Sequence, residues 1–263
     1  MIMTEKKEWY LEYEILIDRP GLLGDISSLL GMLSINIVTI NGIDRGRRGL
    51  LIRSRDRYSI ERLESILKQM ETIRLLKLRE PLLQDRIAVR HGRYIQRDRG
   101  DRKTVRFVRD EIGMLVDFMS EIFKQEENAL IGIRGMPRVG KSESVVAASV
   151  SANKKWLLLS STLLKQTVRE KLLRGEYSDD HVYIIDGAVS ARSNNEKHHV
   201  LIREIMNLPV TKVIEHPDLF VRAFNYSLND FDYIIELRND EEEIIRYDTF
   251  HPFAGSTFDS FDF

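Results

Sequence analysis

The 263-residue sequence contains no cysteine, which excludes disulfide bonds, thiolate metal sites, iron–sulfur clusters and a cysteine nucleophile. It has no apolar run close to the roughly 18 residues that a membrane-spanning helix requires. Its first ten residues, MIMTEKKEWY, lack the apolar centre of a signal peptide. Net charge is nearly absent too, because 40 basic residues face 41 acidic ones. We therefore expect a cytoplasmic protein without a membrane partner.

The balanced charge hides an uneven distribution along the chain. Six arginines lie from Arg45 to Arg57, and a second basic run extends from Arg86 to Arg109. The residues after Ser227 instead carry ten acidic side chains. Such asymmetry indicates either partner surfaces or solvated faces that neutralise one another across the fold, and we favour the second interpretation. Nucleic acid is therefore not expected as a partner.

The first eighty residues alternate between strand and helix patterns. Apolar residues recur with period two up to the turn Asp18-Arg19-Pro20-Gly21, and leucines then follow at helical spacing. The expected elements are strands at 9–17, 36–43, 49–53 and 73–78, and helices at 22–33 and 60–70. This βαββαβ order predicts a ferredoxin-like unit over residues 1–80.

Residues 9–80 also resemble an ACT domain, a small regulatory module that binds amino acids and similar ligands. The resemblance is carried by Asp18-Arg19-Pro20-Gly21-Leu22-Leu23 and the following Ile26, at the turn where ACT modules have a D/N-x-P-G-x-L pattern. It implies a small-molecule effector beside Gly21 and Leu22, with Asn36 a weaker candidate, and a homodimer formed through this unit. The alternative is that Pro20-Gly21 only closes a turn.

Residues 81–103 are basic and show no clear periodicity beyond one or two helical turns, which predicts a polar linker. Tyr94 among arginines would also suit an aromatic platform for single-stranded nucleic acid. Such platforms use several aromatic side chains and this segment has one tyrosine, so we favour the linker.

Residues 104–249 predict a second unit, a small P-loop α/β domain with a parallel sheet, so the whole chain is expected to be α/β. An amphipathic helix at 104–125 opens it. Short apolar runs at 130–134, 156–160, 182–186, 211–215 and 232–237 predict strands, and 141–152, 162–174 and 196–208 predict helices between them. Strands that alternate with helices indicate a doubly wound sheet.

One motif carries chemistry. Gly135-Met-Pro-Arg-Val-Gly140-Lys141-Ser142 matches G-x-x-x-x-G-K-[ST] between a predicted strand and a predicted helix. Glycines let backbone N–H groups converge on phosphate oxygens, and the helix N-terminus adds partial positive charge. The predicted cofactor is therefore ATP, or another nucleoside triphosphate, with Mg²⁺. The predicted binding residues are Gly135, Arg138, Gly140, Lys141, Ser142 and Glu143. A loop that has lost its ligand is the alternative.

A second element of such a site would be an acid that ends a buried strand. Asp186 follows Val182-Tyr-Ile-Ile and resembles a Walker B aspartate, although an ordinary Asp186-Gly187 turn is the alternative. Its spacing from the loop resembles the additional-strand class of P-loop ATPases. We predict catalytic roles for Lys141 and Asp186 and magnesium ligation by Ser142 and Asp186.

Two further segments bear on turnover. Phe107-Val108-Arg109-Asp110-Glu111 partly resembles the entry segment of AAA-type ATPases but lacks its glycine. Many of these ATPases carry a glutamate directly after the Walker B aspartate, where this chain has Gly187. The other candidates for polar roles are Glu196, Glu215, His216 and Arg192. Glu215 ends the fourth predicted strand, roughly where such ATPases have a polar sensor residue, and the adjacent His216 is an alternative for that role. Each of the four is alternatively a surface or capping residue.

Residues 250–263, FHPFAGSTFDSFDF, predict either a flexible tail or a short peptide that docks on a protein partner. Over its whole length the chain looks like the YmfK-like proteins of bacilli, a resemblance that implies no activity.

We therefore expect a ligand-regulated nucleotide-binding protein that binds ATP, with weak or conditional ATPase activity and a regulatory role. One alternative is a small-molecule kinase with a lid from Arg169, Lys171 and Arg174 or Arg192. The other is a non-enzymatic ACT-based adaptor with a silent loop.

Overall fold

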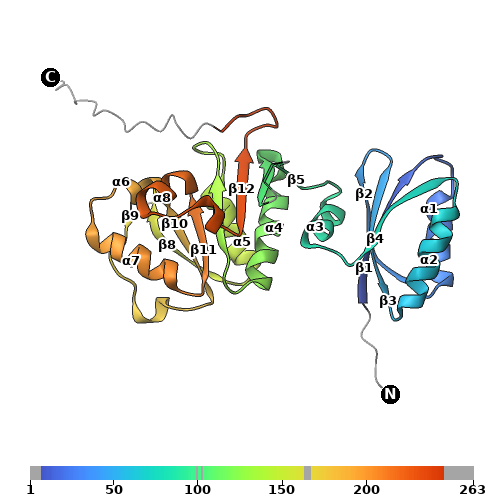
Figure 1. Ribbon diagram of the computed structural model, residues 1–263, viewed down its shortest axis with the longest axis horizontal. Helices are drawn as coiled ribbons and strands as arrows, with labels where there is room; N and C mark the ends of the chain where they lie inside the picture. Colours follow the sequence, from blue (N-terminus) through green and yellow to red (C-terminus); the bar gives the residue numbers. More distant parts are fainter. Residues whose placement is uncertain (1–6, 99, 102, 163–166, 246–263) are drawn as a thin grey trace, which may run out of the picture.

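Two β-sheets organise the chain in a computed structural model, which describes residues 7–98, 100–101, 103–162 and 167–245 (Figure 1). A four-stranded antiparallel sheet has the order β2-β3-β1-β4, and an eight-stranded mixed sheet has the order β5-β6-β12-β7-β11-β10-β8-β9. The expected α/β class is confirmed. The predicted tail at 250–263 lies outside the described residues.

The N-terminal unit has the βαββαβ order expected from the sequence. Its elements are β1 (Lys7–Ile15), α1 (Leu22–Met32), β2 (Asn36–Asp44), β3 (Arg47–Ser54), α2 (Arg57–Gln69) and β4 (Ile73–Arg79). Alternate residues of β1 face opposite sides of the sheet. Leu11 and Tyr13 join the apolar core formed with α1 and α2, whereas Tyr10 is buried against the other face.

The predicted linker contains a nine-residue helix, where the sequence pattern indicated no more than one or two helical turns. α3 (Leu83–His91) lies between the two sheets, on the face opposite α1 and α2 (Figure 1). Ala88 and Val89 pack with Tyr10 of the first unit, while Ile87 belongs to the core of the second. α3 is therefore buried on two sides, and its apolar residues do not form the single stripe by which an amphipathic helix is recognised.

The C-terminal sheet is parallel at its centre and antiparallel at its edges. Its strands are β5 (Gln96–Arg97), β6 (Thr104–Val108), β7 (Leu130–Arg134), β8 (Lys155–Ser161), β9 (Thr167–Val168), β10 (His181–Asp186), β11 (Thr211–Glu215) and β12 (Tyr233–Arg238). The strands from β6 to β8 in the sheet order run parallel, and β5 and β9 pair antiparallel at the edges.

Helices cover both faces of this sheet. They are α4 (Ile112–Gln125), α5 (Lys141–Ser151), α6 (Gly187–Arg192), α7 (Glu196–Asn207) and α8 (Pro217–Phe224), with 3₁₀ turns η1 (Arg109–Glu111), η2 (Arg174–Glu176) and η3 (Leu228–Asp230). Along β10, Ile184 joins the core that contains α4 and α5, and Ile185 joins the core that contains α7 and α8. This alternation explains why β10 is apolar on both faces.

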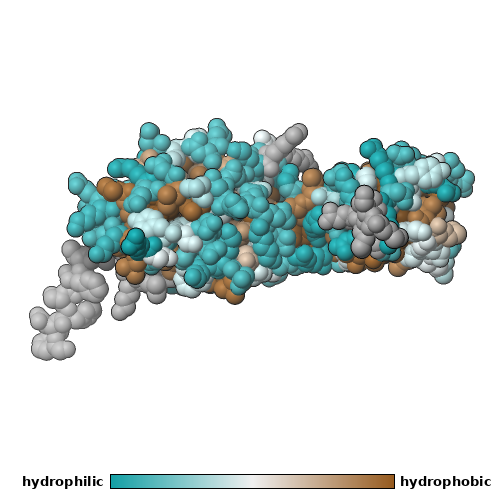
Figure 2. Space-filling model, turned by 90° about the horizontal axis from the view of Figure 1, so that it is seen from below, coloured by the Kyte–Doolittle hydropathy of each residue, from teal (hydrophilic) through white to brown (hydrophobic). Residues whose placement is uncertain are grey.

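No helix in the described ranges has the length and apolar character needed to cross a bilayer. On the face drawn in Figure 2, hydrophilic side chains predominate and hydrophobic ones gather in separate patches.

Two predicted helices of the second unit are wrong in part. Residues 104–108 form strand β6 beside β12, and α4 begins only at Ile112, because Phe107 and Val105 are buried as sheet residues rather than as a helix face. The helix predicted at 162–174 is absent from its described part, 167–174. There β9 pairs with the end of β8, with Thr167 opposite Ser161. The predicted purely parallel sheet of five strands is accordingly a mixed sheet of eight.

The two-sided burial of α3 predicts the effect of truncating Ile87, which is fully buried. Ile87→Ala should lower the free energy of unfolding by about 2–5 kcal/mol, because it removes apolar contacts and leaves a cavity. Leu82→Ala should cost under about 0.5 kcal/mol, because Leu82 is 56% exposed. Urea denaturation of both variants measures the difference. Equal effects would show that α3 is not part of the core.

Candidate functional site

The glycine loop, residues 135–142, connects β7 to α5. A Cβ at Gly135 would lie 2.5 Å from the carbonyl oxygen of Leu237, so no larger residue fits without moving β12. Arg138 and Gly140 have φ of 65° and 108°, in the left-handed region that glycine adopts most readily. Gly140 caps α5, which begins at Lys141. The predicted binding residues therefore lie together on a turn that ends at a helix N-terminus.

Lys141 is folded onto the loop itself. Its ammonium donates hydrogen bonds to the carbonyl oxygens of Gly135 and Met136, both at 2.9 Å, and the residue is 6% exposed. Burial lowers the pKa of Lys141, while Glu215 and Asp186 act in the opposite direction. Lys141 thus lies within electrostatic reach of both carboxylates without an ion pair to either in the described structure.

Asp186 is held rigidly at the end of β10. Its Oδ1 accepts hydrogen bonds from the backbone N–H groups of Ala188 and Val189, at 2.9 and 3.1 Å, and so caps α6. The buried Ser160 hydroxyl bonds to both the N–H and the carbonyl oxygen of Asp186. These contacts fix the direction of a carboxylate that is 3% exposed.

Glu215 lies between the glycine loop and Asp186. It ends β11, which separates β7 from β10 in the sheet, and it pairs in register with Asp186. Burial raises the pKa of Glu215 to about 7, and the negative charge of Asp186 adds to the increase. The nearby Ser142 hydroxyl favours the ionised form of the Glu215 carboxyl and so acts to lower its pKa. The sequence analysis placed Glu215 at the end of the fourth predicted strand, roughly where ATPases of the additional-strand class have a polar sensor residue. It did not place Glu215 beside Asp186, because nothing in the sequence specifies which strands β11 pairs with.

Gly187, which stands where many ATPases have a glutamate, is required by packing. A Cβ there would lie 2.7 Å from the carbonyl oxygen of Glu215, 2.8 Å from that of His216 and 2.9 Å from Cβ of Phe220. Both carbonyls belong to the backbone that connects β11 to α8. An acidic side chain at position 187 is therefore excluded by the close approach of α6 to this connection.

His216 and Arg192 border the same group of charges. Burial lowers the pKa of His216 to about 4, and Lys141 and Arg192 lower it further while Asp186 opposes them. The His216 ring is therefore neutral at pH 7. Its backbone has a φ of 53°, a left-handed conformation in which asparagine, aspartate and histidine are the non-glycine residues found most often.

The segment 107–111 packs against the glycine loop. The Arg109 guanidinium donates a hydrogen bond to the carbonyl oxygen of Arg138 at 2.9 Å. Ile112, the first residue of α4, approaches Gly140, where a Cβ would lie 3.1 Å from its Cδ1. The start of the second unit therefore borders one side of the loop.

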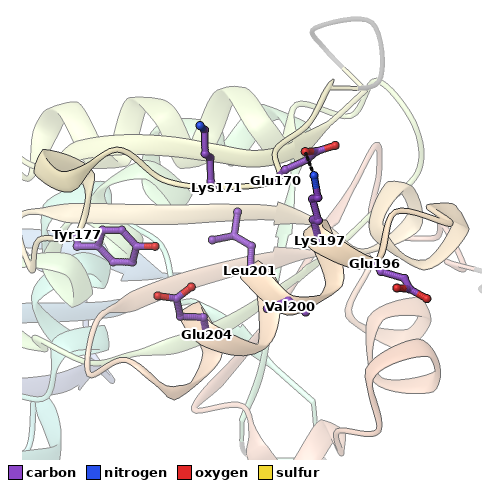
Figure 3. A pocket seen from close by; sticks show the side chains of 8 residues that line it. All are labelled: Glu170, Lys171, Tyr177, Glu196, Lys197, Val200, Leu201 and Glu204. Carbon is purple, nitrogen blue, oxygen red and sulfur yellow. Dashed lines mark ion pairs between the residues drawn. The ribbon is translucent and has the colours of Figure 1, made fainter.

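The remaining candidates lie elsewhere. Glu196 lines a cleft of about 320 Å³ (Figure 3), whose lining residues are Glu170, Lys171, Tyr177, Glu196, Lys197, Val200, Leu201 and Glu204. None of these belongs to the glycine loop, and neither Asp186 nor Glu215 is among them.

In the N-terminal unit, Gly21 caps α1 with a φ of 85°, and Leu22 is buried in the core formed with α1.

The donor set suits Mg²⁺ that is bound partly by phosphate. Among the described residues no group of three or more His, Asp and Glu is arranged to hold a metal ion on its own. Mg²⁺ prefers oxygen ligands and commonly uses one or two protein groups together with phosphates and water. The Ser142 hydroxyl, at the start of α5, and the Asp186 carboxylate, at the end of β10, are two protein oxygen donors of this kind.

The raised pKa of Glu215 makes stability depend on pH. Its pKa is about 7 in the folded chain against an ordinary value of 4.5, so the stability it contributes below pH 4.5 is lost as the pH rises through 7. Glu215→Gln removes this loss, on the order of 3 kcal/mol at full extent. Its melting temperature should therefore exceed that of the wild type more at pH 8 than at pH 5.

Glu127→Gln, a change at an exposed residue, is the control and should show the same difference from the wild type at both pH values. If the melting temperatures of Glu215→Gln and the wild type followed parallel pH profiles, the carboxyl would not be buried as described.

Comparison with known proteins gives two matches. A family model described as "Protein of unknown function (DUF3388)" matches residues 75–262, which includes part of β4 and the whole described second unit. The "Uncharacterized protein YmfK" of Bacillus subtilis (strain 168) is 66% identical over 261 residues, and the match covers 98% of this chain and 97% of the relative. Because the family model matches well over half of the chain, the chain belongs to the DUF3388 family.

Proposed function

We propose that this chain is a ligand-regulated nucleotide-binding protein, which binds ATP or another nucleoside triphosphate with Mg²⁺ and has weak or conditional ATPase activity. The observation that carries the proposal is the meeting of Lys141 and Ser142, at the start of α5, with Asp186 and Glu215, at the ends of two parallel strands. Cationic, hydroxyl and carboxylate groups at a helix N-terminus are what a magnesium-bound triphosphate requires.

Each candidate has a distinct role in this proposal. The backbone N–H groups of Gly140, Lys141, Ser142 and Glu143 point toward the phosphates, because the first N–H groups of a helix have no partner within it. The Lys141 ammonium exchanges its two loop carbonyls for phosphate oxygens. Ser142 and Asp186 hold Mg²⁺, which neutralises phosphate charge. Arg138, at the exposed bend of the loop, is free to turn toward the phosphates.

The order of the strands supports membership in the additional-strand class of P-loop ATPases. In that class a further strand separates the strand before the loop from the strand that ends in the Walker B aspartate. β11 has this position between β7 and β10. The contact between Arg109 and Arg138 is consistent with the partial likeness of 107–111 to the entry segment of such ATPases.

The N-terminal unit supports regulation by a small molecule. Its βαββαβ order, its antiparallel sheet and the left-handed Gly21 at the first turn suit an ACT-like module, with an effector beside Gly21 and Leu22 and a homodimer through this unit. Regulation requires that the effector bind two conformations with different affinity, and that the loop differ between them.

A continuous set of contacts connects this unit to the loop. The Tyr94 hydroxyl donates to the buried Glu12 carboxylate of β1, and the neighbouring Arg93 pairs with Glu111 at 2.9 Å. Glu111 lies in η1, two residues from Arg109, which contacts the loop. An effector that shifts the first sheet against α3 therefore has a route to the nucleotide site.

Calorimetric titration of ATP and GTP with Mg²⁺ tests the proposal. The wild type should bind one nucleotide with micromolar affinity, and Lys141→Ala should bind it at least roughly 10-fold more weakly, because a charged hydrogen-bond donor contributes about 1.5–3 kcal/mol. Lys212→Ala is the matched control, because Lys212 is a buried lysine of the same sheet that donates to the carbonyl oxygen of Leu208. It should bind like the wild type.

Absence of heat and of any thermal shift with either nucleotide would contradict the proposal. The chain would then be the non-enzymatic adaptor with a silent loop. Phosphate transfer from ATP to a small molecule, without hydrolysis in its absence, would instead identify a kinase.

A further inference from the structure

Hydrolysis at this site needs a group that orients the attacking water. The position directly after Asp186 cannot supply it, because the backbone carbonyls of Glu215 and His216 occupy the space of a side chain at Gly187. Asp186 is itself engaged, since its Oδ1 caps α6. If the chain turns over a triphosphate, the acceptor therefore comes from another element.

Two other partly or fully buried acids near the loop, Asp218 and Glu236, form ion pairs with arginines. Asp218 binds the Arg134 guanidinium through both carboxylate oxygens, at 2.8 and 2.9 Å. Glu236 contacts Arg106 and Arg238 at 2.9 and 2.8 Å. Charge-assisted pairs of this kind hold a carboxylate in place and take up its lone pairs.

Glu215 differs from these acids in its partners and in its position. Its side chain lies close to the Ser142 hydroxyl, and it is paired in register with Asp186 on the neighbouring strand. An ionised carboxylate has about four acceptor positions, so even a hydrogen bond from Ser142 would leave capacity for a water molecule. The carboxylate is thus beside the residues proposed to hold Mg²⁺, with no arginine partner among the described contacts.

We propose that Glu215 is a catalytic residue that orients the attacking water, in the role that position 187 cannot fill. This inference rests on the proposed nucleotide binding.

The water oxygen forms a bond to the γ-phosphorus as the bond from that phosphorus to the bridging oxygen breaks, and ADP leaves with the electron pair. The proton that the water loses passes to a carboxylate oxygen of Glu215 and from there to solvent. No other reactant is needed.

Two substitutions test this role. Glu215→Gln keeps the size of the side chain and an oxygen for Ser142 but removes the negative charge. We expect its kcat for hydrolysis of Mg·ATP to fall on the order of 100-fold, while KM and the calorimetric Kd change only a few-fold. Glu215→Asp keeps the charge but withdraws it by about 1.5 Å and should also lose most of the kcat, because misplacement by about 1 Å costs up to 100-fold.

Glu196→Gln is the control. Glu196 was the other acid considered from the sequence, but it lines the cleft of Figure 3 and should leave kcat unchanged. The assignment would be overturned if Glu215→Gln hydrolysed Mg·ATP with the kcat of the wild type, or if Glu196→Gln lost as much kcat as Glu215→Gln. A wild type that binds Mg·ATP but does not hydrolyse it would overturn this assignment and leave nucleotide binding standing. A wild type that binds no nucleotide would overturn both.

Discussion

The candidate site depends on the parallel pairing of β7, β11 and β10. Parallel strands end at the same edge of a sheet, so this pairing brings the glycine loop, Glu215 and Asp186 together although about 80 residues separate the first from the second. The same pairing buries two carboxylates beside one lysine that is bound to carbonyl oxygens. Burial, together with the negative charge of Asp186, raises the pKa of Glu215, and the two neighbouring carboxyl groups favour a cation at this edge.

A second constraint is the burial of α3 on both sides. Val89 belongs to the core on the face of the N-terminal sheet opposite α1 and α2, and Ile87 belongs to the core of the second unit. Moving one unit against the other therefore disrupts apolar packing. Ion pairs reinforce this arrangement, among them Arg90 of α3 with Asp117 of α4 at 3.1 Å. A segment that joins the units in this way transmits displacement better than the polar linker expected from its composition.

Local patterns predicted the elements that local chemistry determines. The turn before Gly21, the glycine loop and the strand that ends at Asp186 were all identified from short motifs. The missed elements depend on distant partners: Phe107 lies in a strand because β12 pairs with β6, and Thr167 because it faces the end of β8. The position of Glu215 beside Asp186 also could not be predicted, because it depends on the order of the strands in the sheet. The glycine at 187 is explained only by tertiary packing, since backbone carbonyls occupy the space of a side chain there.

The central claim is that a nucleotide binds at the glycine loop, and amide hydrogen exchange with and without Mg·ATP tests it most directly. Bound phosphates would occupy the N–H groups at the start of α5 and hold the ends of β10 and β11 in place. The account predicts slower exchange in residues 135–144 and at 186–189 and 215–216, with little change around the cleft lined by Glu170 and Glu204. Unchanged exchange in the loop, or protection confined to that cleft, would contradict it.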